Sequence, residues 1–190
     1  MANLTLWQIE LWPWYGLGIY WLVAAFRVKS TQSREPLAAR IFTLAVVGFA
    51  FALLFSHYFQ AGFLGERFLA PNLAIQRAGV VLTFLGAALA IWARTILGAN
   101  WSAQISLKVN HQLIRSGPYA YVRHPIYTGL MLAYSGTAIV IGEWRGLLAI
   151  VVAAVGITLK AKREEALMIT VFGDQYVQHR RDTGFLLPRL

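Results

Sequence analysis

The chain alternates between long apolar stretches and shorter polar connections. Five stretches consist mostly of hydrophobic residues, at roughly 11–28, 38–61, 73–97, 126–142 and 144–161. Each approaches the about 20 apolar residues that an α-helix needs to cross the hydrocarbon core of a bilayer. Because backbone groups in lipid must be hydrogen-bonded internally, apolar stretches of this length favour helices. The pattern predicts an all-α fold, a multi-pass transmembrane helical bundle with about five spans.

The last two apolar stretches are expected to form a helical hairpin, since only "GEW" separates them. After Lys160 the helical pattern continues but becomes amphipathic, with charged residues opposite an apolar side. In "FGDQY", Gly173 indicates that the helix stops and restarts. We therefore expect the fifth span to run out of the membrane as a cytoplasmic C-terminal helix that reaches about Arg181.

Composition supports a membrane protein with a single domain. Hydrophobic residues make up 58% of the chain and charged residues 13%, whereas a soluble domain carries about 25% charged residues. No room remains for a separate soluble domain, so 1–190 is expected to form one unit. Its first part, 1–97, holds three spans, and 98–190 holds the long loop, the hairpin and the C-terminal helix.

The charges of the chain have a simpler explanation than nucleic-acid binding. The net charge is +9, but the basic residues are scattered through the connections between apolar stretches, as the positive-inside rule describes. The absence of cysteine excludes disulfides, thiolate nucleophiles and cysteine metal sites. The first apolar stretch is preceded by Glu10 and not by a basic segment, so we interpret it as a retained span and not a removable signal.

The distribution of lysine and arginine predicts an orientation in the membrane. Fourteen of the 17 lie in the first connection, the third connection and the C-terminal segment: Arg27, Lys29, Arg34, Arg40, Arg94, Lys108, Arg115, Arg123, Lys160, Lys162, Arg163, Arg180, Arg181 and Arg189. Only Arg67, Arg77 and Arg145 belong to the opposite side. The rule predicts an N-terminus outside and a C-terminus in the cytoplasm.

The most unusual polar segment is "LIRSGPYAYVRHPIYTG", residues 113–129, between two apolar stretches. "SGPY" indicates a turn, and Pro125 suits the first position of a helix because its missing N–H costs nothing there. His124 would then lie at the N-cap and Tyr127 one turn further on. A helix N-terminus offers free N–H groups to a carboxylate or phosphate. The alternative is an anchoring role, with arginines on the cytoplasmic side and tyrosines in an aromatic belt.

A second polar cluster, Glu164 and Glu165, follows the fifth apolar stretch on the same predicted side. Lys160 and Glu164 are four residues apart and hence share one helix face. A surface salt bridge is the alternative, but lysine N-terminal to glutamate is the weaker orientation for helix stability. A third feature is "GANWSAQISLKVNHQLI", residues 98–114, which is expected to form a long polar loop with the segment that follows. Long loops in compact folds are usually functional or disordered.

The segments "HQLIRSGPYAYVRHPIYTG" and "KAKREEALMITVFGDQY" resemble the isoprenylcysteine carboxyl methyltransferase family, including its prokaryotic members. The resemblance covers about residues 98–188 with both motifs in the same order. The first two spans are similar only in being hydrophobic. Phospholipid N-methyltransferases are also similar in the "RHPxYxG" region, so an amine acceptor stays open as an alternative.

This resemblance implies that the chain binds S-adenosylmethionine. The family's cofactor positions fall on Gln104, His111, Gln112, Leu113, Ile114, Tyr119, His124, Pro125, Ile126, Tyr127 and Glu164. The family's substrate-contacting arginine falls on Lys160, which cannot make the planar bidentate contact of an arginine with a carboxylate. Lys160, for substrate binding and catalysis, and Glu165 are the candidate catalytic residues, and no metal is expected.

The implied reaction is methylation of a lipophilic substrate, an isoprenylcysteine-like carboxylate, at the cytoplasmic membrane face. The expected partners are a lipophilic small molecule or lipidated substrate and membrane lipids, without nucleic acid. A carboxylate is already ionised near pH 7, whereas an amine acceptor requires a base, for which Glu165 and His124 are candidates. The alternatives are a phospholipid or amine N-methyltransferase, an NADPH-dependent sterol-type reductase and a non-catalytic membrane scaffold.

Overall fold

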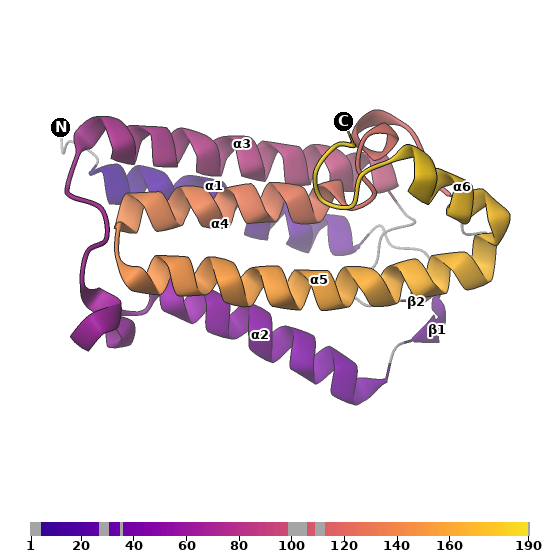
Figure 1. Ribbon diagram of the computed structural model, residues 1–190, viewed down its shortest axis with the longest axis horizontal. Coiled ribbons are helices and arrows are strands. Elements are labelled where there is room, and N and C mark those ends of the chain that lie inside the picture. The colour runs from indigo at the N-terminus through magenta and orange to yellow at the C-terminus, as the bar shows by residue number, and fades with distance from the viewer. Residues whose placement is uncertain (1–4, 27–30, 35, 99–105, 109–112, 190) are drawn as a thin grey trace.

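The computed structural model describes residues 5–26, 31–34, 36–98, 106–108 and 113–189 (Figure 1). The α-helices are α1 Leu6–Ala25, α2 Leu37–Phe55, α3 Leu73–Leu97, α4 Pro125–Ile141, α5 Trp144–Phe172 and α6 Asp174–Asp182. Short 3-10 helices occupy η1 His57–Gln60, η2 Gly62–Gly65 and η4 Gly117–Ala120, and two strands occupy β1 Thr31–Arg34 and β2 Ser106–Lys108.

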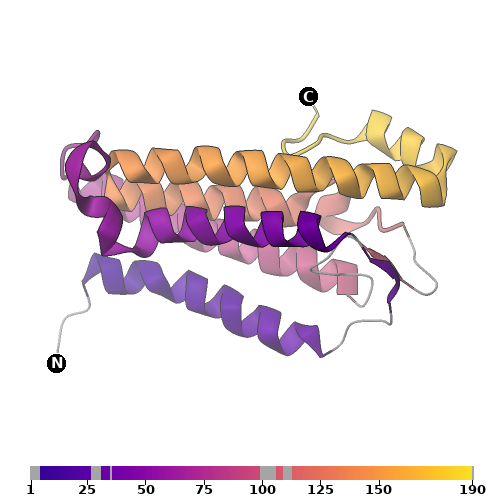
Figure 2. The ribbon, with the colours of Figure 1, turned by 90° about the horizontal axis from the view of Figure 1, so that it is seen from below.

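Helices α1 to α5 lie side by side, and successive helices alternate in direction (Figures 1 and 2). The two strands, the start of α4 and α6 therefore gather at one end of the bundle, here called the motif end. The start of α1, the start of α3 and the α4–α5 turn lie at the other end, here called the far end. The predicted bundle and the hairpin of α4 and α5 are confirmed.

Helices α3 and α4 pack closely through small residues. A Cβ atom added to Gly86 would lie 2.5 Å from the carbonyl oxygen of Gly129, and one added to Gly129 would lie 2.5 Å from that of Gly86. One added to Gly136 would lie 2.5 Å from the carbonyl oxygen of Gly79. Small residues allow helix backbones in membranes to approach in this way. The close contact fixes α4, and hence the motif at its start, against α3.

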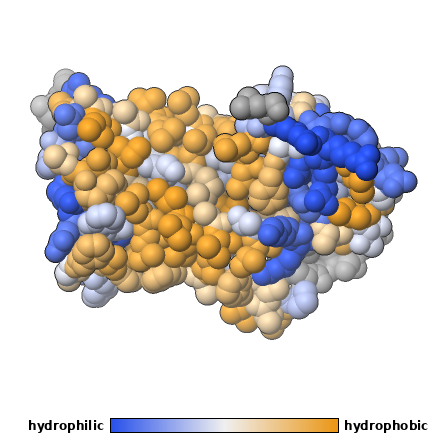
Figure 3. Space-filling view, viewed as in Figure 1, coloured by the Kyte–Doolittle hydropathy of each residue, from blue (hydrophilic) through white to orange (hydrophobic). Residues whose placement is uncertain are grey.

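The surface of the bundle is that of an integral membrane protein. Helices α2, α3 and α5 are long and apolar enough to cross a bilayer, and α4 is a shorter apolar helix of 17 residues. Figure 3 shows a broad apolar surface over the middle of the molecule and hydrophilic surface at both ends. Apolar side chains such as Leu44, Val81 and Val151 are exposed there, as contact with lipid allows. The number of helices that cross the membrane stays a prediction.

Two predicted boundaries were wrong. Helix α1 begins at Leu6 and not near residue 11, because Thr5 and Gln8 form a capping box that starts it earlier. Glu10 is therefore inside the helix and fully buried, not a polar residue in front of a span. Helix α2 ends at Phe55, six residues before the predicted end at 61, because Ser56 adopts an extended conformation and caps η1.

The two-stranded sheet was not predicted. Strands β1 and β2 pair antiparallel, with Arg34 opposite Ser106 and Thr31 opposite Lys108. They join the α1–α2 connection to the α3–α4 connection at the motif end (Figure 1). Backbone groups outside helices still need hydrogen-bond partners when they leave bulk water. The ladder between β1 and β2 supplies these partners. In the described ranges the fold is thus an α-helical bundle with one small sheet.

Candidate functional site

The polar motif has the turn and helix start that its sequence predicts. Gly117 opens η4 with a φ of 59°, a left-handed conformation that glycine adopts without strain. His124 is the N-cap of α4 and Pro125 its first residue, and no side chain caps this helix among the described residues. The start of α4 therefore presents backbone N–H groups at the motif end.

The second motif lies against this helix start. The hydroxyl of Tyr127 donates a hydrogen bond of 2.6 Å to Glu164 Oε1, and His124 Nδ1 lies 3.7 Å from Glu164 Oε2. The rings of His124 and Tyr127 stack with centroids 5.6 Å apart. Lys160 Nζ lies 5.8 Å from the centroid of the Tyr127 ring. Four residues predicted for the site thus meet at the contact between α4 and α5.

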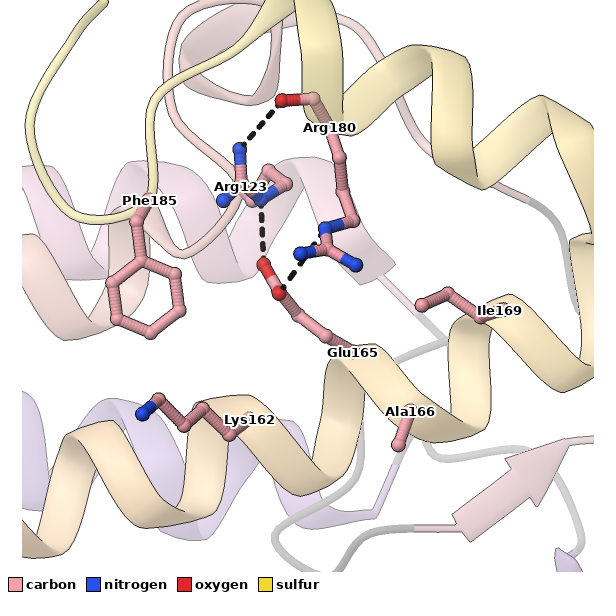
Figure 4. A pocket seen from close by; sticks show the side chains of 7 residues that line it. All are labelled: Arg123, Lys162, Glu165, Ala166, Ile169, Arg180 and Phe185. Atoms are coloured by element: carbon pink, nitrogen blue, oxygen red, sulfur yellow. Dashed lines mark hydrogen bonds and ion pairs between the residues drawn. The ribbon is translucent and has the colours of Figure 1, made fainter.

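The neighbouring glutamate has different partners. Glu165 Oε1 lies 2.5 Å from Arg123 Nε and 3.4 Å from His124 Nε2. Glu165 Oε2 lies 3.5 Å from Arg180 Nε (Figure 4). Glu165 is buried, and cations close to a carboxylate favour its ionised form. These contacts make Glu165 a weak proton acceptor and a strong link between α4, α5 and α6.

Arg123 also holds the C-terminal segment in place. Its Nη1 donates to the backbone carbonyls of Thr183 and Arg180. Its backbone N–H donates to the carbonyl of Gly184 at 2.9 Å, and the N–H of His124 donates to that of Phe185 at 3.3 Å. The segment after α6 therefore runs along the start of α4, an arrangement that the sequence did not predict.

The remaining predicted cofactor residues fall into two groups. Gln104, His111 and Gln112 lie outside the described residues. Leu113 and Ile114 are half-buried, and Ile114 packs against a cluster of Ala93, Tyr119 and Ile126. Pro125 is also buried. Ile114, Pro125 and Ile126 thus form an apolar wall at the start of α4.

Tyr119 is a neutral member of that wall. Its side chain is buried, and burial raises the pKa of its phenol, as does the negative charge of Glu164. Both effects disfavour the phenolate, because neither a low-dielectric surrounding nor a nearby carboxylate stabilises it. The phenol of Tyr119 therefore stays uncharged.

Helix α6 contributes residues that were missed in the sequence. Tyr176 and His179 are buried, and Arg115 Nη2 donates to the carbonyl of Gln175 at 2.6 Å. Burial lowers the pKa of His179, and the charges of Arg115 and Arg123 lower it further. The only sequence signal for these α6 residues was the excess of basic residues in the C-terminal segment, and the positive-inside rule already explained that excess.

Comparison with known proteins places both motifs in one family. The model of the phospholipid methyltransferase family matches residues 75–175, just over half of the chain. Protein-S-isoprenylcysteine O-methyltransferase of Schizosaccharomyces pombe is 35% identical over 94 residues, which are 48% of this chain and 40% of that protein.

A solved structure has a similar fold. It is a eukaryotic intramembrane Ras methyltransferase, isoprenylcysteine carboxyl methyltransferase, with a TM-score of 0.57 and 22% identity. The match covers 80% of this chain and 51% of that chain, so the present chain spans about half the length of the proteins it matches. The resemblance expected from the two motifs is confirmed. The chain belongs to the phospholipid methyltransferase family and is similar to the isoprenylcysteine carboxyl methyltransferases.

Proposed function

We propose that the chain is an S-adenosylmethionine-dependent methyltransferase that methylates the carboxylate of a lipophilic, isoprenylcysteine-like substrate at the cytoplasmic membrane face. The names of the two similar proteins support this reaction class. The observation that carries the proposal is the hydrogen bond between Tyr127 and Glu164, which joins the two motifs inside the matched region. If the motif end faces the cytoplasm, the N-terminus lies outside, because successive helices alternate in direction and α1 starts at the far end.

The residues at the motif end fit the chemical groups of the cofactor. When bound, S-adenosylmethionine supplies an electrophilic methyl group on a sulfonium and also carries a carboxylate, an amino group and ribose hydroxyls. Glu164 accepts hydrogen bonds from the amino group or the hydroxyls. The N–H groups at the start of α4 suit the carboxylate, and the faces of Tyr119 and Tyr127 attract a cation by about 0.5–2 kcal/mol.

The proposed cofactor set also includes residues that shape the site without charge. Ile114, Pro125 and Ile126 form the apolar wall beside the helix start, and Leu113 belongs to the proposed set as the residue before Ile114. Gln104, His111 and Gln112, which precede this wall in the sequence, complete the proposed set. His124 orients Glu164 from its Nδ1 side, because that atom lies 3.7 Å from the carboxylate.

A carboxylate acceptor agrees with the charge at the contact. Lys160 lies beside Tyr127 and Glu164, and its ammonium attracts a carboxylate but repels the ammonium form of an amine. A carboxylate is ionised near pH 7 and needs no base. Catalysis then rests on alignment of the acceptor by Lys160 and on exclusion of water.

The amine of a phospholipid is the second candidate acceptor, because the matching family model is that of phospholipid methyltransferases. This acceptor needs a group that removes a proton. Glu165 is engaged by Arg123 and Arg180, which leaves His124 as the base in that case.

One experiment separates these acceptors. Membranes that contain the protein are incubated with methyl-labelled S-adenosylmethionine, the lipids are extracted, and the labelled product is treated with base. We expect a base-labile methyl ester, absent from membranes with Glu164→Ala. A base-stable product would indicate that the methyl acceptor is an amine or a thiol and not a carboxylate. In thermal unfolding of the purified protein, stabilisation by NADPH and not by S-adenosylmethionine would contradict methyl transfer and favour a reductase.

A further inference from the structure

Helix α5 carries a second feature on the face opposite to Lys160 and Glu164. A cavity of about 420 Å³, here called the outer groove, is lined by Arg123, Lys162, Glu165, Ala166, Ile169, Arg180 and Phe185 (Figure 4). Lys162, Ala166 and Ile169 are three or four residues apart and therefore share one helix face. Lys160 and Glu164 lie about half a turn away, so the outer groove is separate from the contact of Glu164 with Tyr127.

The outer groove has an excess of positive charge. Three cations line it against one carboxylate, and that carboxylate, Glu165, is held by Arg123 at 2.5 Å. Arg180 is less tightly bound, since its Nε lies 3.5 Å from Glu165 and its side chain is 44% exposed. Lys162 is exposed and makes no hydrogen bond or ion pair with the part of the chain that the structure describes. Lys162 and Arg180 can thus turn towards an anion.

The surface that leads to the groove is apolar. Val151, Val155 and Leu159 are exposed at intervals of four residues on α5, and the same helix face continues into Lys162 and Ala166. Phe185 and Ile169 add apolar walls to the groove itself (Figure 4). Figure 3 shows the change from apolar to hydrophilic surface towards the motif end. The groove therefore lies where a bilayer changes from acyl chains to headgroups.

We propose that the outer groove binds the headgroup phosphate of an anionic phospholipid. Lys162 and Arg180 contact the phosphate, and the acyl chains lie along Val151, Val155 and Leu159. Basic pockets beside membrane helices on the cytoplasmic side suit such headgroups. The apolar stripe favours a lipid over a soluble phosphate, because bilayer acyl chains that contact Val151, Val155 and Leu159 bring their headgroups to the two cations. This inference does not depend on the proposed methyl transfer, because it uses another face of α5.

The test measures lipid binding by the full chain in detergent. Dioleoylphosphatidylglycerol and dioleoylphosphatidylcholine, which share acyl chains, are titrated separately, and bound lipid is counted by native mass spectrometry. We expect saturation at one phosphatidylglycerol per chain and at least ten-fold weaker binding of phosphatidylcholine. Lys162→Gln and Arg180→Gln should each weaken phosphatidylglycerol binding about ten-fold, because hydrogen bonds to charged groups contribute this much.

Two further variants keep the test decisive. Arg181→Gln removes the same charge from an exposed position of α6 that does not line the groove, and it should change binding less than two-fold. Ala166→Glu adds a carboxylate at an exposed position of the groove and should abolish the preference for phosphatidylglycerol without unfolding the chain. Inorganic phosphate at millimolar concentration should not compete with the lipid.

Three results would overturn the proposal. An equal loss in Arg181→Gln would show that diffuse charge and not the groove attracts the lipid. Effective competition by inorganic phosphate would make the groove a simple anion site. Unchanged phosphatidylglycerol binding in Ala166→Glu would place the lipid elsewhere, even if Lys162→Gln or Arg180→Gln failed to fold.

Discussion

The two ends of the bundle each bury a glutamate, but they surround it with different partners. At the far end, Glu10 accepts hydrogen bonds from the hydroxyls of Thr83 and Thr137 at 2.8 and 2.5 Å. At the motif end, Glu165 is bound by Arg123 and lies near Arg180. The two glutamates lie far apart along the bundle. Thr137, a partner of Glu10, and His124, a neighbour of Glu165, are 13 positions apart, which corresponds to about 20 Å along the axis of α4.

The difference separates a packing function from an electrostatic one. Glu10 joins α1 to α3 and α4 through neutral hydroxyls, and Trp14 donates to Thr137 in the same network at 3.0 Å. Such a network specifies how the helices pack inside lipid. Glu165 instead neutralises cations close to the polar end of the molecule, where the motif and the C-terminal segment must be held together.

Arg145 shows that a buried cation at the far end also has a packing function. Its Nη1 donates to the carbonyls of Leu53 and Leu54 at 2.9 and 2.8 Å, and its Nε donates to Glu143 at 2.5 Å. These carbonyls belong to the last turn of α2, where an arginine satisfies groups that the helix leaves open. At the far end a charged side chain thus caps the C-terminus of α2, whereas at the motif end charged side chains hold the candidate site together.

The largest expected effect is on stability at the motif end. Glu165→Gln leaves the guanidinium of Arg123 buried without its counter-charge, and loss of one partner of a buried pair typically costs about 3–5 kcal/mol. Unfolding in mixed detergent micelles should show a loss of this order. The double variant Arg123→Gln/Glu165→Gln removes both charges and should recover part of it. A single variant as stable as the parent would contradict an electrostatic function for Glu165.

The next effect is on cofactor binding. Glu164→Gln removes the negative charge but keeps an oxygen that accepts from Tyr127, so we expect folding to persist and affinity for S-adenosylmethionine to fall about 10–100-fold. Isothermal titration calorimetry of the detergent-purified protein measures this affinity. Glu66→Gln is the matched control, since Glu66 is exposed at the far end. Equal affinities of the parent and Glu164→Gln would remove Glu164 from the proposed site.

At the far end the same chemical change should have little effect. Glu10→Gln keeps an oxygen that accepts from both hydroxyls, so the free energy of unfolding should change by less than about 1 kcal/mol. Thr137→Val should cost about 1–3 kcal/mol, because it removes one donor to Glu10 and leaves the buried Trp14 Nε1–H without its acceptor. Unfolding in mixed micelles compares the two variants. A loss at Glu10→Gln as large as that at Glu165→Gln would abolish the distinction between the two ends.

The smallest effect concerns pH. The pKa of His179 is lowered from 6.5 in the folded protein by burial and by two arginines, so the unfolded chain binds the proton more readily. Stability should therefore decrease as pH falls below about 6.5 and be fully present above it. The midpoint of thermal unfolding at pH 5.5 and 7.5 measures this change. His179→Gln cannot titrate and should show a smaller difference, and an unchanged difference would assign the pH dependence to other groups.

Much of the site was predictable because it depends on local patterns. His124 at the N-cap, Pro125 at the first helical position and the break at Gly173 follow from the conformational preferences of proline and glycine. Lys160 and Glu164 share a helix face because of their spacing. The contact of Glu164 with Tyr127 is consistent with the family resemblance, which links two motifs that are 37 positions apart.

Other features were not predictable because their partners are distant in the sequence. Arg123 and Glu165 are 42 positions apart, and each had an adequate local explanation as a surface charge. Nothing local indicated that residues 184–185 would pair with the backbone of the motif. The buried hydrogen bonds of Glu10 were missed for the same reason, since its hydroxyl partners are 73 and 127 positions away.

The hydrophobic pattern and the two motifs identify a helical membrane protein with a polar motif at the start of one helix and a matching cluster beyond another. Hydrophobic length and helix-start preferences are properties of neighbouring residues, so they can be recognised without a structure. The packing of the helices then shows which glutamate meets Tyr127, which one neutralises Arg123, and that a separate basic groove lies on the other face of α5. These outcomes depend on how helices rotate against one another, and a rotation by one residue changes which side chains meet.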